Sequence, residues 1–189
     1  MSAIEIGAVI FSLLSVGFAI RRSVWNWPLG IIGVALYLVL FYEVKLFADM
    51  ILQAVFVVQG IYGWYLWTKN RNIDHIVNVA VLNLKQRLLI TVAIVMFSIL
   101  WAEALIRYTE ASMPYVDALA STLSFAATWT MARRKIECWI LWITADIIYI
   151  GLFWYKELFL SSGIYTLFLV LAVIGFIRWN KNLINTASH

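Results

Sequence analysis

Seven mainly apolar stretches, separated by short polar segments, organise this chain of 189 residues. A helix needs about 20 mainly apolar residues to cross the hydrocarbon core of a bilayer. A membrane β-barrel would instead show alternating segments of about ten residues, so the pattern predicts helices. The predicted spans are Ile4–Ile20, Val24–Tyr42, Leu46–Trp67, Leu88–Ile106, Pro114–Ala132, Ile136–Tyr155 and Leu158–Trp179.

The composition supports a lipid environment for these stretches. Hydrophobic residues make up 64% of the chain and charged residues 13%, whereas a soluble domain has about half and about a quarter. The first stretch has Glu5 as its only charge and no basic region before it, so we expect a permanent span and not a cleaved signal peptide. The sequence therefore predicts an all-α integral membrane protein.

Positive charges are distributed unevenly between the two predicted sides of the membrane. Of the 14 Lys and Arg residues, only Lys45, Arg107 and Lys156 fall on one side, which leaves eleven on the other. Cytoplasmic loops carry the excess of Lys and Arg, so we expect the N-terminus outside and the C-terminus inside. The same distribution accounts for the net charge of +4 through membrane insertion and contact with anionic lipid, and nucleic acid is not an expected partner.

The chain contains an internal duplication. Residues Arg21–Trp67 align with Arg133–Trp179 at a constant offset of 112 without a gap, and fourteen of the 47 columns are identical. Spans one to three and five to seven form the two copies, and a period of four spans gives both copies the same orientation. The sequence predicts two parallel triple-helix bundles, 1–67 and 114–189, joined by a loop and linker helix, 68–113. Chance similarity among apolar helices is the alternative, and a gapless match that includes Arg-Arg and several aromatic columns argues against it.

Asp146 lies near the centre of the sixth span, where the first copy has Val34. A carboxylate at the bilayer centre costs about 2.5–3.5 kcal/mol on insertion scales, and no Lys or Arg lies in the middle of any predicted span. Two readings remain open. Asp146 faces a translocation path and meets a cation or a donor-rich ring, or it is a protonated or hydrogen-bonded structural residue packed against Ser or Thr.

Two tryptophans share a helix face with this carboxylate. Trp139, Trp142 and Asp146 have the spacing i, i+3, i+7, and two indoles beside a carboxylate can sandwich a flat cationic ring. Trp139 lies near a span end and also fits an interfacial anchor. Further polar groups within spans three and seven can line a substrate site or bond between helices. These candidate substrate-binding residues are Gln53, Gln59, Tyr165 and Thr166.

Signatures of catalysis are missing from the sequence. There is no His/Cys/carboxylate cluster with metal spacing, no nucleophile beside a base and no glycine-rich phosphate loop. We therefore expect no enzyme activity, no metal and no cofactor.

The run Trp139-Ile-Leu-Trp142-Ile-Thr-Ala-Asp146 resembles the WxxWxxxN/D signature of the PnuC family of vitamin transporters. Trp27-Pro-Leu-Gly30 and Tyr62-Gly63-Trp64-Tyr65-Leu66-Trp67 are similar to the family's first copy. The resemblance implies a SWEET-like 3+1+3 architecture in a bacterial cytoplasmic (inner) membrane. It also implies facilitated diffusion of a vitamin or precursor, trapping by a cytoplasmic kinase, and a homotrimer.

The residue at the signature position bears on the substrate. A carboxylate at Asp146 favours a cation, and thiamine and nicotinamide riboside are both cationic. Thiamine adds an aminopyrimidine that a carboxylate can hold through two hydrogen bonds, so thiamine is slightly preferred and nicotinamide riboside comes close behind. A heptahelical receptor or sensor, and a proton-coupled transporter of the same substrates, are the alternatives.

Overall fold

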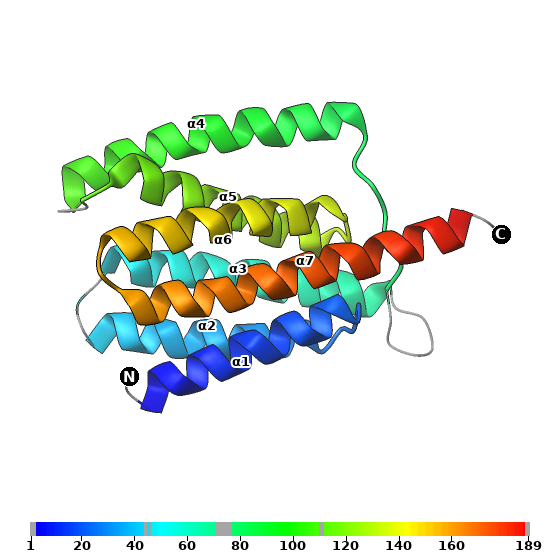
Figure 1. The fold of residues 1–189 in the computed structure, drawn as a ribbon, viewed down its shortest axis with the longest axis horizontal. Helices are drawn as coiled ribbons and strands as arrows, with labels where there is room; N and C mark the ends of the chain where they lie inside the picture. The colour runs from blue at the N-terminus through cyan, green and yellow to red at the C-terminus, as the bar shows by residue number, and fades with distance from the viewer. Residues whose placement is uncertain (1–2, 44, 46, 71–76, 110–111, 188–189) are drawn as a thin grey trace. The chain divides into compact units, whose positions relative to one another are not determined.

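The computed structural model describes residues 3–43, 45, 47–70, 77–109 and 112–187. These residues form seven helices and the connections between them. Each predicted span coincides with one helix, which confirms the all-α fold class. Figure 1 shows their course along the chain. The helices are α1 (Ala3–Ile20), α2 (Asn26–Glu43), α3 (Phe47–Lys69), α4 (Leu84–Tyr108), α5 (Pro114–Ala132), α6 (Glu137–Tyr155) and α7 (Phe159–Ala187).

Local chemistry explains where these helices begin. Helix α4 starts at Leu84, before the predicted span, because Asn83 forms a capping box with Gln86 through bonds of 2.9 and 3.1 Å. Helix α5 starts at Pro114 as predicted, since the first helical position needs no N–H donor. Helix α7 continues past Trp179 to Ala187, and this polar extension was not predicted from hydropathy.

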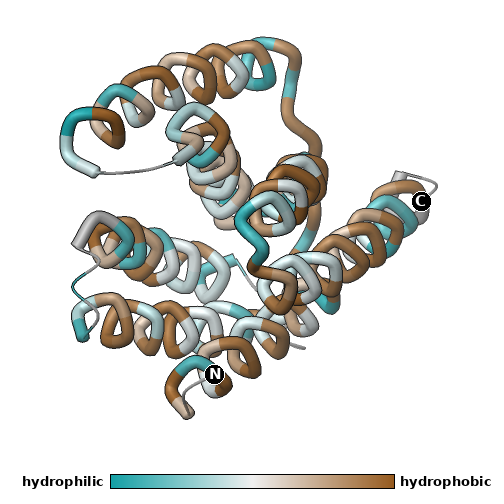
Figure 2. The backbone as a smooth tube through the Cα atoms, turned by 60° about the vertical axis from the view of Figure 1, so that its left-hand side comes forward, coloured by the Kyte–Doolittle hydropathy of each residue, from teal (hydrophilic) through white to brown (hydrophobic). Residues whose placement is uncertain are grey.

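Within the described residues, six helices are long and apolar enough to cross a membrane, namely all except α5. Figure 2 shows apolar residues along the helices and hydrophilic residues mainly toward their ends. Helix α5 contains five serine and threonine side chains. Four of them donate to carbonyls one turn earlier in the same helix, as polar groups in an apolar environment require: Thr122, Ser124, Thr128 and Thr130.

The chain divides into two compact units by its internal contacts. The first is Met1–Val79 with Ala132–Arg134, and the second is Ala80–Met131 with Lys135–His189. In the first unit α2 packs against α1 and α3, and in the second α6 packs against α7. Buried side chains from α4, α5 and α6 form a shared core at Ile94, Leu123 and Ala145. The predicted repeat boundaries at residues 67 and 114 are defined by sequence and stay predictions.

Four helix ends use a left-handed residue that is not glycine. Arg22 and Arg134, at aligned positions, have φ of 60° and 61°, and Lys45 and Glu157, also aligned, both have φ of 60°. The hydrogen bonds are those of a Schellman motif: after α1, Ser23 N–H donates to Phe18 O at 3.0 Å. After α6, Leu158 N–H donates to Phe153 O at 2.8 Å. After α5, Lys135 N–H donates to Thr130 O at 2.9 Å, so α1 and α5 end with the same motif at aligned positions.

Aromatic contacts also occur at aligned positions of the two copies. Trp27 meets Trp67 edge to face at a centroid distance of 5.6 Å and 85°, and Trp139 meets Trp179 at 5.5 Å and 90°. Beside each pair lies a glycine. A Cβ on Gly63 would lie 2.4 Å from the Trp27 ring, and one on Gly175 would lie 2.6 Å from the Trp139 ring.

Candidate functional site

Helix α6 gathers aromatic and acidic side chains on one face. On an ideal helix Trp139, Trp142, Asp146, Tyr149 and Phe153 fall within about 80° of one another, since each residue turns the helix by about 100°. This face lies within the second unit, where α6 packs against α7 (Figure 1). The helix spans 19 residues, so Asp146 is close to its midpoint.

The Asp146 side chain is buried, and the residue is 2% exposed. Among the described residues none forms a hydrogen bond or ion pair with its carboxylate. Its neighbour Ala145 belongs to the apolar core with Ile94 and Leu123, and Tyr149 packs against the same core. A buried carboxylate without a partner carries a large desolvation cost. No hydrogen bond from Ser or Thr to Asp146 is present in the described part of the chain. The alternative of a protonated structural Asp146 stays open.

Trp142 precedes Asp146 by one turn and is half-buried. The aligned residue of the first copy is Gly30, and a Cβ there would lie 2.9 Å from the Ser15 hydroxyl of α1. The first unit thus closes α1 against α2 at the position where α6 has a large indole. The two copies therefore differ in side-chain volume at Gly30 and Trp142, and in charge at Val34 and Asp146.

Trp139 has a different environment from Trp142. It is 1% exposed, its ring lies against Gly175, and its edge meets Trp179. Its Nε1–H has no acceptor among the residues that the structure describes. The same arrangement of two tryptophans and a glycine occurs in the first copy, where the aligned pair is Trp27 and Trp67. Trp139 therefore packs α6 against α7 in this conformation.

Tyr165 of α7 joins an aromatic cluster formed with α6. Its ring centroid lies 4.7 Å from that of Tyr149, 5.2 Å from Phe153 and 5.9 Å from Phe168. Tyr149 and Phe153 stack at 5.8 Å and 15°, and the Tyr149 hydroxyl lies 3.5 Å from the Ser121 hydroxyl. We call Tyr149, Phe153, Tyr165 and Phe168 the aromatic cluster. It begins one turn beyond Asp146 on the same face of α6.

The sequence did not single out Tyr149 and Phe153 as a pair, although a signal was present. Both are identical columns of the duplication, and their counterparts Tyr37 and Phe41 also stack, at 6.0 Å and 20°. The copies differ at another member of the aromatic cluster, because Tyr165 aligns with Gln53. In the second copy Tyr165 therefore adds a ring at a position where the first copy has an amide side chain.

The remaining predicted residues lie on α3 and α7. Gln53 and Gln59 are half-buried on α3, and the contacts of Gln59 include a polar or ring partner. Thr166 is exposed and donates its hydroxyl to Ser162 O at 2.9 Å, so only its acceptor lone pairs are available to another group. The structure does not test these three as ligands of a substrate, and they stay predictions.

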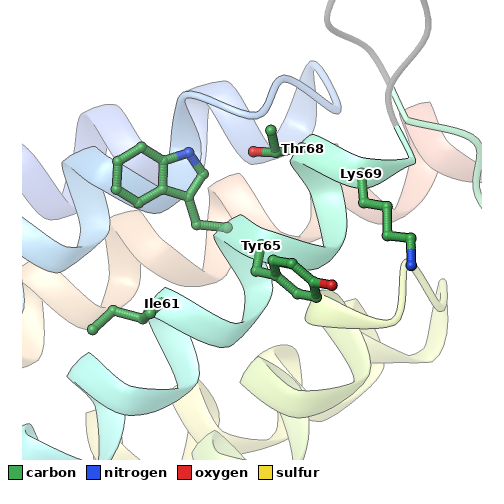
Figure 3. A pocket seen from close by; sticks show the side chains of 5 residues that line it. Ile61, Tyr65, Thr68 and Lys69 are labelled. Atoms are coloured by element: carbon green, nitrogen blue, oxygen red, sulfur yellow. The ribbon is translucent and has the colours of Figure 1, made fainter.

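The structure also shows a hollow on the surface of α3, and none of these candidate residues is among those that line it. It is lined by Ile61, Trp64, Tyr65, Thr68 and Lys69 (Figure 3), which all come from one helix. A flat ring would be covered there from one side only. Such a hollow at a helix end, with two aromatic residues and a lysine, is typical of a membrane interface.

Residues 2–181 match the sequence model of the family described as "Nicotinamide mononucleotide transporter". The chain belongs to this family. Its PnuC relatives include the nicotinamide riboside transporter PnuC of Escherichia coli, 24% identical over 95% of this chain and 83% of that protein. The PnuC of Neisseria mucosa is 28% identical over 92% of this chain and 70% of that protein.

A relative with another named substrate and a solved structure complete the comparison. The riboflavin/roseoflavin transporter RibM of Streptomyces davaonensis is 25% identical over 90% of this chain and 81% of its own length. A crystal structure of the vitamin B3 transporter PnuC superimposes with a TM-score of 0.77 and 27% identity, covering 96% of this chain and 82% of that chain. The resemblance to PnuC seen in the sequence is confirmed. The protein is a multi-pass transporter of the inner membrane from a vitamin-transporting family, and not an enzyme.

Proposed function

We propose that this PnuC-family protein imports a flat, cationic vitamin or vitamin precursor by facilitated diffusion. The observation that carries the proposal is Asp146, a carboxylate with 2% exposure in the middle of α6. A cation that binds at the site compensates the negative charge of the Asp146 carboxylate, which the apolar surroundings do not compensate. Trp142, one turn away, supplies a π-face for an aromatic cation.

The asymmetry between the copies supports a site held mainly by the second one. The first copy has Val34 and Gly30 at the positions of Asp146 and Trp142, and it packs tightly at Gly30. In the proposal Trp142 and Asp146 contact the substrate ring directly. Trp139 contributes by fixing α6 against α7 and by its free indole N–H.

The other predicted ligands receive less direct support. Tyr165 adds a hydroxyl and a ring as a member of the aromatic cluster, which begins one turn from Asp146. Gln53, Gln59 and Thr166 are proposed from their depth along α3 and α7, as groups that bond to a ring edge or to hydroxyls.

We propose thiamine as the preferred substrate, ahead of nicotinamide riboside. The ranking rests on the chemistry of Asp146, because a carboxylate pairs with the charge of both compounds and holds an aminopyrimidine through two hydrogen bonds. The relatives described above are named for nicotinamide riboside and for riboflavin. A riboflavin preference would therefore show that the Asp146 carboxylate acts as a hydrogen-bond acceptor and not as a counter-ion.

The proposal also covers the architecture, orientation and assembly of the transporter and the fate of the imported vitamin. The two copies form parallel triple-helix bundles of SWEET-like arrangement with the N-terminus outside, the protein assembles as a homotrimer, and a cytoplasmic kinase traps the imported vitamin. The matching helix ends and tryptophan pairs support one duplicated unit. No kinase domain is expected in the chain itself, so trapping depends on a separate enzyme.

A binding screen followed by counterflow tests the function. The purified protein is titrated with thiamine, nicotinamide riboside, riboflavin and a nucleoside, and the ligands that bind are tested for exchange of labelled vitamin in liposomes. We expect thiamine and nicotinamide riboside to bind most tightly and to exchange without an ion gradient. Binding without exchange would indicate a sensor, and accumulation that depends on a pH gradient would indicate proton coupling.

A further inference from the structure

Glu137, in the first turn of α6, is held by several donors at once. The Leu82 backbone N–H donates to both carboxylate oxygens of Glu137 at 3.0 and 3.2 Å. Arg87 of α4 donates to Glu137 Oε1 from Nε at 3.1 Å and from Nη2 at 2.8 Å. The Glu137 side chain is 11% exposed and that of Arg87 is 52% exposed. The glutamate is thus the buried centre of the contact and the arginine its solvent-facing partner.

Backbone contacts fix the same region. Ile136 N–H donates to Ala80 O at 3.0 Å, and Lys135 Nζ donates to Val81 O at 3.1 Å. The chain from Ala80 to Leu82 therefore runs beside the start of α6. Helix α4 begins two residues later behind its capping box, so the start of α4 and the start of α6 are tied within one unit.

The direction of this contact around α6 matters for the site. On an ideal helix the positions of Trp139, Trp142 and Asp146 lie about 140–180° away from Glu137, which is the opposite side of the helix. A contact on one side of the first turn fixes the rotation of the helix about its axis. Binding groups need to be held within about 10–20° of their productive orientation, so the rotation of α6 decides whether Trp142 and Asp146 meet a ligand together.

The position aligned with Glu137 in the first copy carries no carboxylate. It is Trp25, which is 61% exposed and uncharged. The ion pair between Glu137 and Arg87 of the linker helix therefore has no counterpart at this aligned position.

We propose that Glu137, held by Arg87 and the Leu82 amide, is a positioning residue that sets the rotation of α6 and thereby the affinity of the site for the vitamin. The proposal rests on the proposed function, since it assigns the ligands to the opposite face of α6. Glu137 itself does not contact the substrate.

The test compares Glu137→Gln, Arg87→Gln and the double variant Arg87→Gln/Glu137→Gln in the full-length protein. The dissociation constant of thiamine and nicotinamide riboside is measured by titration, KM and maximal rate by counterflow, and thermal stability in detergent. The matched control is Asp117→Asn, which breaks the 3.5 Å ion pair with Lys156 at the other end of α6.

We expect each single variant to raise the dissociation constant and KM by about tenfold while the maximal rate stays within about twofold, because each removes one charge of the pair and leaves the opposite charge uncompensated. In the double variant two neutral amides can hydrogen-bond again, and affinity should return to within about threefold of the parent protein. Asp117→Asn should leave affinity unchanged.

Two results would overturn the positioning role. One is unchanged affinity in both single variants, and the other is a loss of affinity that the double variant does not relieve. Arg87 is half exposed, so Arg87→Gln still gives a reading if Glu137→Gln does not fold. The proposed function has a separate readout: if the parent protein binds none of the vitamins, the function fails, whereas normal binding with a loss only in Asp146→Asn refutes the role of Glu137 alone.

Discussion

The indole of Trp139 meets the indole of Trp179 edge to face, with ring centroids 5.5 Å apart and planes at 90°. The contact joins α6 to α7 and leaves the face of Trp139 against the backbone of Gly175. Edge-to-face pairs are worth about 0.5–1.5 kcal/mol beyond the burial of their area. Because α6 carries Asp146 and α7 carries Tyr165, the Trp139–Trp179 pair helps to hold these two candidate residues in a fixed relative position.

Gly175→Ala should destabilise the protein. The new Cβ would lie 2.6 Å from the Trp139 ring, and the ring cannot move without breaking its contact with Trp179. Overpacking of this kind costs roughly 1–3 kcal/mol, which should appear as a lower melting temperature in detergent. Gly163→Ala on the same helix is the control, because a Cβ there meets nothing within 4 Å and alanine favours the helix by about 1 kcal/mol. Equal melting temperatures of the two variants would contradict the packing role.

Asp146→Asn should weaken binding of cationic vitamins much more than binding of riboflavin. The amide keeps the size and one acceptor of the carboxylate but loses its charge, so we expect about a tenfold to hundredfold rise in the dissociation constant for thiamine. That range corresponds to about 1.4–2.8 kcal/mol. Titration with thiamine and with riboflavin measures the difference. Equal effects on the charged and the neutral ligand would show that charge is not what Asp146 contributes.

Trp142→Phe and Trp142→Leu should separate stacking from burial. Phenylalanine keeps a smaller π-face, so thiamine affinity should fall by a few fold, whereas leucine removes the π-face and should lower it by tenfold or more, since cation–π contacts are worth about 2 kcal/mol when desolvated. Affinity is measured by titration, and the melting temperature of both variants shows whether folding is retained. Leucine and phenylalanine variants of equal affinity would rule out a stacked ring at this position.

Tyr165→Phe should preserve the aromatic cluster, and Tyr165→Leu should loosen it. The ring makes centroid contacts of 4.7 and 5.2 Å with Tyr149 and Phe153, and aromatic pairs contribute about 0.5–1.5 kcal/mol each beyond area burial. We expect a lower melting temperature for the leucine variant and an unchanged one for phenylalanine. A reduced affinity in Tyr165→Phe, without loss of stability, would identify the hydroxyl as a substrate contact.

Glu157→Gly should stabilise the turn between α6 and α7. Glu157 has φ of 60°, a left-handed conformation that costs a non-glycine residue roughly 1–2 kcal/mol. Glycine removes that strain but loses more chain entropy on folding, about 0.5–1 kcal/mol, so the net gain should be up to about 1 kcal/mol. Thermal unfolding measures it, and the β-branched variant Glu157→Val should be less stable than the parent. A glycine variant no more stable than Glu157→Val would mean that the turn relaxes to another conformation.

Local patterns were enough to predict the helices, and non-local contacts account for most of what was missed. The bounds of α5 follow directly from Pro114 and the Arg-Arg pair after Ala132. The early start of α4 depends on the Asn83 capping box, which a hydropathy window does not register. The hydrogen bonds of Glu137 reach Leu82, 55 residues earlier, and no local pattern in the sequence indicates them.

The candidate site stays a prediction, and the structure shows the surroundings of its residues. Asp146 was recognisable in the sequence because a central charge contradicts the apolar pattern around it. The position of Trp139 near a span end already distinguished it from Trp142, but not that Gly175 and Trp179 cover Trp139 while Trp142 is half-buried. Which side of an indole is covered depends on the neighbouring helix, and spacing along one helix cannot show it.

The left-handed helix ends bear on the order of events in the evolution of this chain. Under the proposed duplication, Arg22 and Arg134 descend from one ancestral residue, and so do Lys45 and Glu157. The second pair no longer shares a residue type or even a sign of charge, but both members keep a φ of 60°. Under that duplication, the backbone conformation at these positions was kept while side-chain identity changed. Asp146 and Glu137 differ between the halves, so the asymmetry of the proposed site would rest on side chains carried by a backbone design that both halves share.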